Sequence, residues 1–309
     1  MNLDFIAFPL GRFFSFIFNT LAFQNYGLAI IIFTVIVRLV LLPLTIKQYR
    51  STTKMQTIQP QIQELQKRYK NDKEKLNQEM MKLYSEQGVN PAGGCLPLLV
   101  QMPILIALYY IIAQPLKFML QLGLNPKMLM PTGDMIKSID NGITTLFKMI
   151  PKEYVMSNMH DISIINYFTK FPEKIADAAG LITRGDLISM KFLGLNLGLV
   201  PSFSPSRLFG PDMWQYLPLL LIPLLAAATT YIQSKIMTPR GGSAQGTAPA
   251  SAGSMQTSML VVMPLMILIF AFQFPAGMGL YWIVGNIIQI FTQMYINKYI
   301  IKKKEVVKS

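Results

Sequence analysis

The stretch YGLAIIIFTVIVRLVLLPLTI, residues 26–46, carries a single charged residue, Arg38, inside an otherwise apolar run. About 20 consecutive apolar residues are enough for a helix to cross the hydrocarbon core of a bilayer. An arginine near the middle of such a helix costs roughly 2.5–3.5 kcal/mol on insertion scales. We therefore expect Arg38 to face water or a partner group, and we treat it as the first candidate functional residue.

Four further apolar runs predict additional membrane-spanning helices. They cover residues 97–116, 214–234, 258–273 and 278–298, and they contain no Asp, Glu, Lys or Arg before Lys298. In the whole chain 52% of the residues are hydrophobic and only 14% are charged. Helices are the expected form of these runs, because lipid leaves the backbone polar groups no other hydrogen-bond partners. The sequence therefore predicts an all-α polytopic membrane protein with five transmembrane helices.

The distribution of Lys and Arg predicts the orientation of the chain, because cytoplasmic segments of membrane proteins are enriched in basic residues. Residues 47–96, 235–257 and 298–309 together hold 16 basic and 6 acidic residues, whereas residues 1–25 and 117–213 hold 11 and 9. We expect the first group of segments in the cytoplasm and the second group outside. The N-terminus is then outside and the C-terminus is cytoplasmic.

The N-terminal segment, residues 1–25, is rich in Phe and lacks a basic start followed by a small-residue cleavage site. It fits an amphipathic helix that lies in the outer membrane interface; a short extra span is the alternative. The cytoplasmic segment 47–96 carries apolar residues at helical spacing on both sides of Asn71-Asp72. This pattern predicts a helical hairpin with a break and an N-cap at that dipeptide.

The remaining connecting segments are less informative. In residues 117–213, an extracytoplasmic loop or domain, Ile139, Ile143 and Leu146 mark one amphipathic helix. Residues 240–254, within the cytoplasmic loop 235–257, have the composition of a flexible linker. The basic tail 299–309 predicts either a topology anchor near anionic lipid or a contact with ribosomal RNA.

Polar residues recur at helical spacing along the predicted spans, mostly in the cytoplasmic halves. If these faces converge, they form a hydrophilic groove that opens to the cytoplasm and is closed toward the outside. The candidate groove residues are Thr34 and Arg38 in the first span, Gln101 in the second, Gln233 in the third, and Trp282, Asn286, Gln289 and Gln293 in the fifth.

Two alternatives to the groove remain open at this point. Gln, Asn and Thr in membrane helices often only join neighbouring helices, at about 0.6 kcal/mol per hydrogen bond. Arg38 could instead extend its side chain to the interface, although its depth opposes this. No acidic residue occurs in any predicted span to neutralise it.

The fourth predicted span is short. Residues 259–273 give about 22 Å of helix, less than the ~30 Å hydrocarbon core, and short spans thin the bilayer around them. Residues 275–279, Pro-Ala-Gly-Met-Gly, predict a tight outer turn that joins the fourth and fifth spans as a hairpin.

The residue inventory excludes several classes of function. An intramembrane protease needs a Ser/His pair or paired Asp residues in its spans, but the single histidine, His160, lies in the outer segment. One Cys, Cys95, and one His cannot build a metal site, and no phosphate-binding loop motif is present. We therefore expect no catalytic residue, no metal and no cofactor. A small-solute transporter or channel stays as the alternative, although no internal repeat supports it.

An ordered series of motifs resembles the YidC/Oxa/Alb family of membrane protein insertases. The series is Val37-Arg38, Leu42-Pro43-Leu44-Thr45, Lys54-Met55, Gln59-Pro60, residues 90–97 (Asn-Pro-Ala-Gly-Gly-Cys-Leu-Pro), Gln101-Met102-Pro103, Phe274-Pro275-Ala276-Gly277 and Leu280-Tyr281-Trp282 with Asn286. The likeness covers residues 1–115 and 192–301. We expect neither the large periplasmic domain nor the extra N-terminal span of Gram-negative members, so the sequence resembles the short bacterial form.

The resemblance implies an insertase and chaperone that inserts nascent membrane proteins into a bacterial cell membrane without nucleotide hydrolysis. Arg38 matches the groove arginine of the family, and Gln233 and Trp282 match groove-lining positions. The implied partners are nascent chains, the lipid bilayer, the ribosome and targeting factors through the cytoplasmic hairpin and basic tail, and the Sec translocon. Nothing carries over to residues 118–190.

Overall fold

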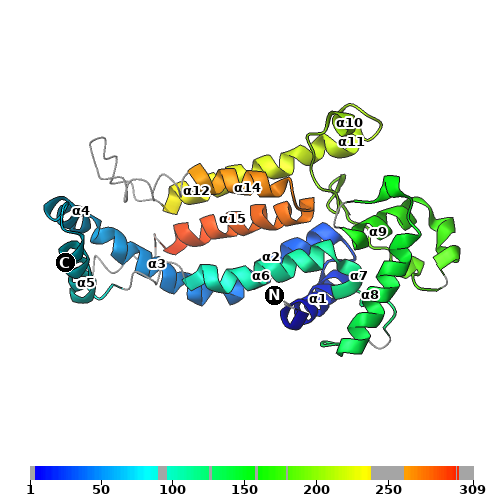
Figure 1. Cartoon of the computed structure of the whole chain (residues 1–309), viewed down its shortest axis with the longest axis horizontal. Helices are drawn as coiled ribbons and strands as arrows, with labels where there is room; N and C mark the ends of the chain where they lie inside the picture. Colours follow the sequence, from blue (N-terminus) through cyan, green and yellow to red (C-terminus); the bar gives the residue numbers. More distant parts are fainter. Residues whose placement is uncertain are drawn as a thin grey trace. The chain divides into compact units, whose positions relative to one another are not determined.

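The computed structural model describes residues 4–89, 96–124, 127–156, 159–178, 180–237, 261–296 and 298. These residues are mostly helical, which confirms the all-α class (Figure 1). The one strand pair among them is the antiparallel hairpin of β1 (Lys191–Phe192) and β2 (Leu195–Asn196). The predicted linker 240–254, the basic tail 299–309 and Cys95 with its preceding Gly-Gly lie outside the described residues.

The chain divides into two compact units, which we describe separately. Unit 1 comprises Met1–Ile36, Met102–Ala227 and Met266–Val284. Unit 2 comprises Val37–Gln101, Ala228–Leu265 and Gly285–Ser309.

The N-terminal segment of unit 1 forms a helix of its own. It consists of α1 (Asp4–Phe16) and the π-helical turn η1 (Ile17–Leu21), and it meets α2 (Tyr26–Val40) at an angle of 118°. The chain reverses at Phe23 and Gln24, which adopt positive φ angles. The side chain of Asn25 then accepts a hydrogen bond from the Leu28 amide and so caps α2. The position of α1 at a membrane surface stays a prediction.

One described stretch, Met213–Ile236, is by itself long and apolar enough to cross a bilayer. It runs through α11 (Met213–Tyr216), η6 (Pro218–Leu220) and most of α12 (Leu221–Met237). The pair of α1 with η1 and α2 qualifies only if the two bent parts are counted as one span. The count of five spans therefore stays a prediction.

The predicted tight turn at residues 275–279 is wrong. The chain turns at 272–275, and α15 (Ala276–Ile296) begins directly after Pro275, following α14 (Met263–Ala271). The first amides of α15 have partners outside the helix: Ala276 donates to the Leu199 carbonyl and Gly277 to the Leu197 carbonyl. These bonds satisfy amide groups that a helix start leaves open, so α15 can begin without a longer turn.

Small residues near the ends of α15 and α2 permit close packing in unit 1. A Cβ at Gly279 would lie 2.2 Å from Cγ2 of Ile222 on α12, and a Cβ at Gly27 would lie 2.1 Å from Cγ of Phe192 on β1. Glycine is therefore needed at these two positions because a neighbouring element lies so close. The helical backbone itself would accept other residues there.

The segment between the second and third predicted spans is a small helical domain within unit 1. It begins after α6 (Leu96–Ala113). Its main helices are α7 (Pro115–Phe118), α8 (Gly133–Lys148) and α9 (His160–Lys170). Four short helices complete it: η3 (Lys152–Tyr154), η4 (Pro172–Ala178), η5 (Arg184–Asp186) and α10 (Pro205–Leu208). Ile139, Ile143 and Leu146 are buried in it, as their spacing predicts.

Lys117 joins the three main helices of this domain. Its backbone amide donates to Oδ2 of Asp161 on α9 at 3.1 Å, and its Nζ lies 2.8 Å from Oδ1 of Asp140 on α8. Asp161 is almost completely buried. Burial raises the pKa of the Asp161 carboxyl to about 7, and the backbone hydrogen bonds from Lys117 and Leu116 oppose the shift only in part.

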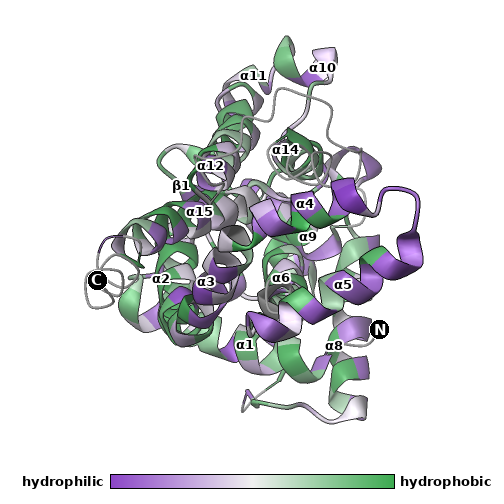
Figure 2. Cartoon of the chain, turned by 90° about the vertical axis from the view of Figure 1, so that its left-hand side faces the viewer, coloured by the Kyte–Doolittle hydropathy of each residue, from purple (hydrophilic) through white to green (hydrophobic). Residues whose placement is uncertain are grey.

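Unit 2 contains the predicted helical hairpin. It is built from α3 (Leu42–Thr57), α4 (Gln59–Arg68) and α5 (Lys73–Glu86). Asp72 caps α5 by accepting the Lys75 amide, which confirms the predicted N-cap. Ile58, Ile62 and Val89 form a small core, and hydrophilic residues dominate the rest of α4 and α5 (Figure 2). Between α2 and α3 the helix is interrupted at Leu41, because Pro43 lacks an amide hydrogen.

We predict that Gly27→Ala destabilises the protein by about 1–3 kcal/mol, because the added methyl overlaps the ring of Phe192 and the packing must shift. Thermal unfolding of the purified protein in detergent measures the effect. The control is Gly142→Ala in α8, where the nearest atom to a Cβ, on Leu181, is 4.0 Å away. That change should stabilise by up to about 1 kcal/mol; equal effects of the two substitutions would contradict the close packing of Gly27.

We predict that the stability of the helical domain falls as pH rises from about 4 toward 7. The pKa of Asp161 in the folded state, about 7, lies above its ordinary value of 3.8. The stabilisation from its protonated form is therefore complete below pH 3.8 and is lost as the pH rises through the folded-state pKa. Hydrogen exchange of α9 at a series of pH values, corrected for intrinsic rates, measures this slope. Asp161→Asn should flatten it and the exposed control Asp134→Asn should not; an unchanged slope in Asp161→Asn would refute the assignment.

Candidate functional site

Arg38 forms the centre of a polar cluster in unit 2. It lies in the last turn of α2 and is half-buried. Its Nη1 donates a hydrogen bond of 2.7 Å to Oε1 of Gln289 on α15. The structure thus brings together two candidate residues that are 251 positions apart in the chain.

Gly285 makes this approach possible. A Cβ at Gly285 would lie 2.8 Å from Nη2 of Arg38 and 3.4 Å from its Nε. The guanidinium therefore packs directly against the backbone of α15. Nε of Arg38 is buried and has no hydrogen-bond partner among the described residues, so the guanidinium retains donor capacity for another group.

Asn286, the next residue of α15, connects this helix to α12. Its Nδ2 donates to Oγ1 of Thr229 at 3.1 Å and to Oγ1 of Thr230 at 2.8 Å. Asn286 is almost completely buried. Side-chain hydrogen bonds of this kind position neighbouring helices, and the groove role of Asn286 stays a prediction.

Tyr49 on α3 belongs to the same cluster and was missed in the sequence analysis. Its ring is 2% exposed, and its hydroxyl faces Gln289 and the charge of Arg38. The hydroxyl has no well-formed hydrogen bond to a described residue. A signal existed, because Arg38, Thr45 and Tyr49 follow each other at spacings of seven and four, which place them on one helical face.

Three further candidates lie in unit 2: Gln101 on α6, Gln233 on α12 and Gln293 on α15. Gln293 is almost completely buried and the other two are half-buried. All three make contacts of their own. Their participation in a groove with Arg38 stays a prediction.

Thr34 and Trp282 are placed in unit 1. Thr34 is fully buried, and its hydroxyl donates to the Ile30 carbonyl one turn earlier in α2. Trp282 packs edge-on against Phe274 with 6.2 Å between ring centroids, and Phe274 in turn contacts Tyr109. Thr34 shares the helix and the face of Arg38, but its hydroxyl proton is already used within the helix. The groove role of both residues also stays a prediction.

No ion pair neutralises Arg38 in the part of the chain that the structure describes. The ion pairs found there join Lys117 with Asp140, Lys137 with Asp134, and Lys174 with Asp177. Gln289 is a neutral acceptor, so it orients the guanidinium without cancelling its charge. The cluster can therefore attract a carboxylate.

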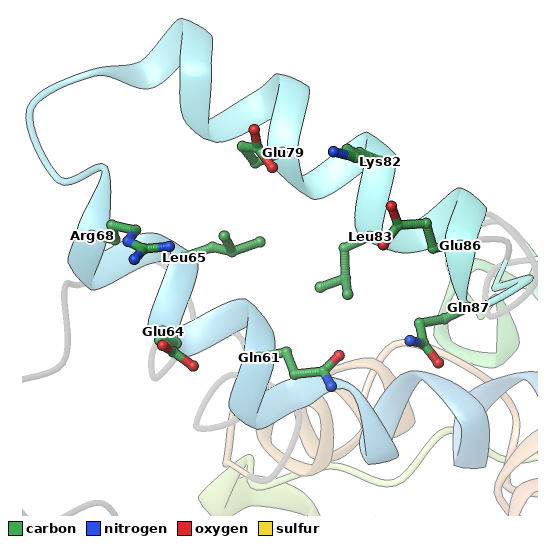
Figure 3. Close-up of a pocket in the computed structure, with 9 residues that line it drawn as sticks. All are labelled: Gln61, Glu64, Leu65, Arg68, Glu79, Lys82, Leu83, Glu86 and Gln87. Carbon is green, nitrogen blue, oxygen red and sulfur yellow. The ribbon is translucent and has the colours of Figure 1, made fainter.

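A second polar feature of unit 2 is a pocket of about 340 Å³ between α4 and α5. Leu65 and Leu83 face each other across it, and charged residues surround them (Figure 3). The charged lining consists of Glu64, Arg68, Glu79, Lys82 and Glu86. This pocket combines a small apolar floor with charges of both signs.

A sequence model of the family described as the 60Kd inner membrane protein matches residues 17–304 of the chain. The chain belongs to this family. Its similarity to a membrane protein insertase YidC from Clostridium perfringens is 35% identity over 272 residues, which cover 88% of this chain and 78% of that protein.

Two other relatives show comparable likeness. A membrane protein insertase YidC from Oceanobacillus iheyensis is 33% identical over 91% of this chain and 78% of its own length. The membrane protein insertase MisCA of Bacillus subtilis is 29% identical over 97% of this chain and 80% of its own length. These matches confirm the resemblance to the YidC/Oxa/Alb insertases, and they extend through residues 118–190.

We predict opposite stability effects for two substitutions of Gln289. Gln289→Leu removes the acceptor of Arg38 and should destabilise by about 1–3 kcal/mol, because a partly buried charged donor is left without its bond. Gln289→Glu should stabilise, because a charge-assisted bond replaces a neutral one. Thermal unfolding in detergent measures both. The same changes at exposed Gln63 on α4 should stay within about 0.5 kcal/mol; effects of one sign at Gln289 would contradict the contact.

Proposed function

We propose that this chain is a membrane protein insertase and chaperone, which inserts nascent integral membrane proteins into the cell membrane without hydrolysing nucleotide. Membership of the family and the names of its relatives support this function. The single structural observation that carries the mechanism is Arg38, held by a neutral amide and without an ion-pair partner among the described residues. The comparisons give no support to the alternative of a small-solute transporter or channel.

The proposed mechanism uses the charge of Arg38 to attract acidic residues in the outgoing segment of a client. In our proposal Thr34, Gln101, Gln233, Trp282, Asn286, Gln289 and Gln293 line a hydrophilic groove with Arg38. Such a groove lowers the desolvation cost for a short polar segment that must cross. The apolar segment of the client then enters the lipid, driven by burial of its own surface.

The proposal includes a topology of five spans with the N-terminus outside and the C-terminus in the cytoplasm. The basic residues of 47–96, 235–257 and 298–309 support this orientation. In it the groove opens toward the cytoplasm, where nascent chains arrive. The predicted fourth span, residues 259–273, amounts to about 22 Å of helix, and in our proposal this short span thins the bilayer locally.

The proposed partners at the cytoplasmic side are the ribosome, targeting factors and the Sec translocon. The hairpin of α4 and α5 offers the charged pocket of Figure 3, whose mixed signs suit a polar protein surface. The basic tail 299–309 supplies the charge for contact with ribosomal RNA. No catalytic residue, metal or cofactor is part of this proposal.

We predict that Arg38→Ala blocks the insertion of single-span clients with acidic translocated tails, and that Arg38→Lys largely preserves it, because the charge is what attracts the client. Insertion into proteoliposomes, read by protease protection of the tail, measures the effect. A client with a neutral tail is the internal control and should be affected much less.

The matched control on the same helix is Val40→Ala. Val40 follows Arg38 by two residues, about 200° around α2, and its side chain is 71% exposed. This variant should insert both clients normally. Full insertion of the acidic client by Arg38→Ala would refute the role of the charge.

A further inference from the structure

Unit 1 contains a cavity with a net positive lining that the proposed insertase mechanism does not use. It has a volume of about 410 Å³ and lies between the N-terminal helix and the domain formed by residues 115–199. Arg12 and Lys127 supply positive charge to its lining, Asn19, Thr20 and Asp186 supply polar groups, and Phe16 supplies an aromatic ring. We propose that this cavity binds the headgroup of an anionic phospholipid, with the phosphodiester between Arg12 and Lys127.

The charges of the cavity favour a ligand with one negative charge. Neither Arg12 nor Lys127 forms an ion pair with a described residue. Asp186 is the one carboxylate of the lining, and its Oδ2 accepts hydrogen bonds from the amide and the hydroxyl of Thr183, at 2.9 and 2.7 Å. Two cations and one carboxylate leave a net charge of about +1, which a phosphodiester neutralises.

The polar side chains of the cavity favour a headgroup that donates hydrogen bonds. Nδ2 of Asn19 donates to the carbonyl of Ser15 at 2.8 Å, and the hydroxyl of Thr20 donates to the carbonyl of Phe16 at 2.6 Å. Their donors are thus used by the helix, while Oδ1 of Asn19 and the lone pairs of Thr20 remain as acceptors. Together with Asp186 they suit the hydroxyl groups of a glycerol headgroup, as in phosphatidylglycerol.

Exposed apolar side chains on the N-terminal segment, which contributes Arg12 and Phe16 to the cavity, suit the acyl chains of the same lipid. Phe16 is 57% exposed, and Phe13, Leu21 and Phe23 on the same segment are also exposed. The opposite face of the segment is packed, since Phe8 contacts Phe118 with 4.9 Å between ring centroids. A helix with one packed face and an exposed aromatic edge beside basic residues is typical of the membrane interface.

The position of Arg12 is set by a tight contact next to it in the chain. A Cβ at Gly11 would lie 2.2 Å from the carbonyl oxygen of Phe118, so α1 touches the backbone of α7, and Figure 1 shows the two helices together. The backbone of α1 beside Arg12 is thus fixed within unit 1. The lipid site depends on the proposed function in one respect: the topology proposed there places the cavity at the outer leaflet, from which the lipid would come.

The test uses the full-length protein in detergent with photoreactive phosphatidylglycerol at sub-saturating concentration. Mass spectrometry of the labelled peptides gives the yield at residues 4–21 and 120–130. Arg12→Gln with Lys127→Gln should lower this yield about twenty- to thirty-fold, since each basic residue near a lipid surface contributes about 1 kcal/mol. Arg12→Lys with Lys127→Arg keeps both charges and should restore most of the labelling, and an unchanged thermal unfolding of the Arg12→Gln/Lys127→Gln variant in detergent excludes a folding defect as the cause of its loss.

The matched control is Lys148→Gln with Lys152→Gln, which removes the same charge from exposed positions of the same domain outside the cavity. It should change labelling less than about two-fold. Photoreactive phosphatidylcholine, which lacks both the net charge and the hydroxyl donors, should label these peptides weakly. Competition by millimolar inorganic phosphate would show a free-anion site and overturn the lipid assignment, and equal labelling of the wild type and the Arg12/Lys127 double variant would overturn the site.

The labelling is measured without a client, so its outcome is separate from the insertase proposal. Loss of labelling with intact insertion of acidic-tailed clients supports the lipid site and leaves Arg38 as the insertion residue. Unchanged labelling of the Arg12/Lys127 double variant refutes the lipid site and does not affect the test of Arg38 in insertion.

Discussion

The close approach of the Arg38 guanidinium to the backbone of α15 is the contact on which the candidate site depends. An unpaired charge in a half-buried position is costly, so it needs hydrogen bonds that hold it in place. Gln289 supplies such a bond at 2.7 Å, and Gly285 leaves the space for it. A carboxylate in place of Gln289 would hold the arginine more firmly but would cancel its charge. A neutral acceptor combines a fixed position with a free charge, which is what attraction of an acidic client segment requires.

α15 takes part in both units, and its two halves have different tasks. Its first turn in unit 1 is fixed by backbone hydrogen bonds to Leu197 and Leu199 and by the contact of Gly279 with Ile222. Its second half in unit 2 carries Asn286, which binds Thr229 and Thr230, and Gln289, which binds Arg38. Each half therefore relies on residues that allow close approach or hydrogen bonding between helices, as expected where apolar side chains alone give little selectivity between neighbours.

Periodicity predicted those parts of the fold that depend on local patterns. The N-cap at Asp72 and the buried face of α8 follow from spacing along one helix. The start of α15 was wrong because the groups that satisfy its first amides, at Leu197 and Leu199, come from a loop almost 80 residues away. The spacing of the polar stripe identified Gln289 and Arg38 as candidates, but it could not show that they touch. Gly285 carried no signal at all, since only the approach of Arg38 reveals why a side chain is absent there.

Among the described residues some charges are matched within the fold and others are not, and this contrast supports the proposed role of Arg38. In unit 1, Lys117 is 14% exposed and is matched by Asp140, while buried Asp161 receives backbone hydrogen bonds, so these charges serve the folded domain. Arg12 and Lys127 in unit 1, whose cavity Asp186 also lines, and Arg38 in unit 2 form no ion pair with a described residue. A charge that only stabilised the fold would gain from an ion pair or from removal. Arg38 is half-buried, is positioned by the amide of Gln289 and keeps its charge, which fits our proposal that an acidic client segment binds there. The net positive lining at Arg12 and Lys127 fits the proposed lipid phosphate in the same way.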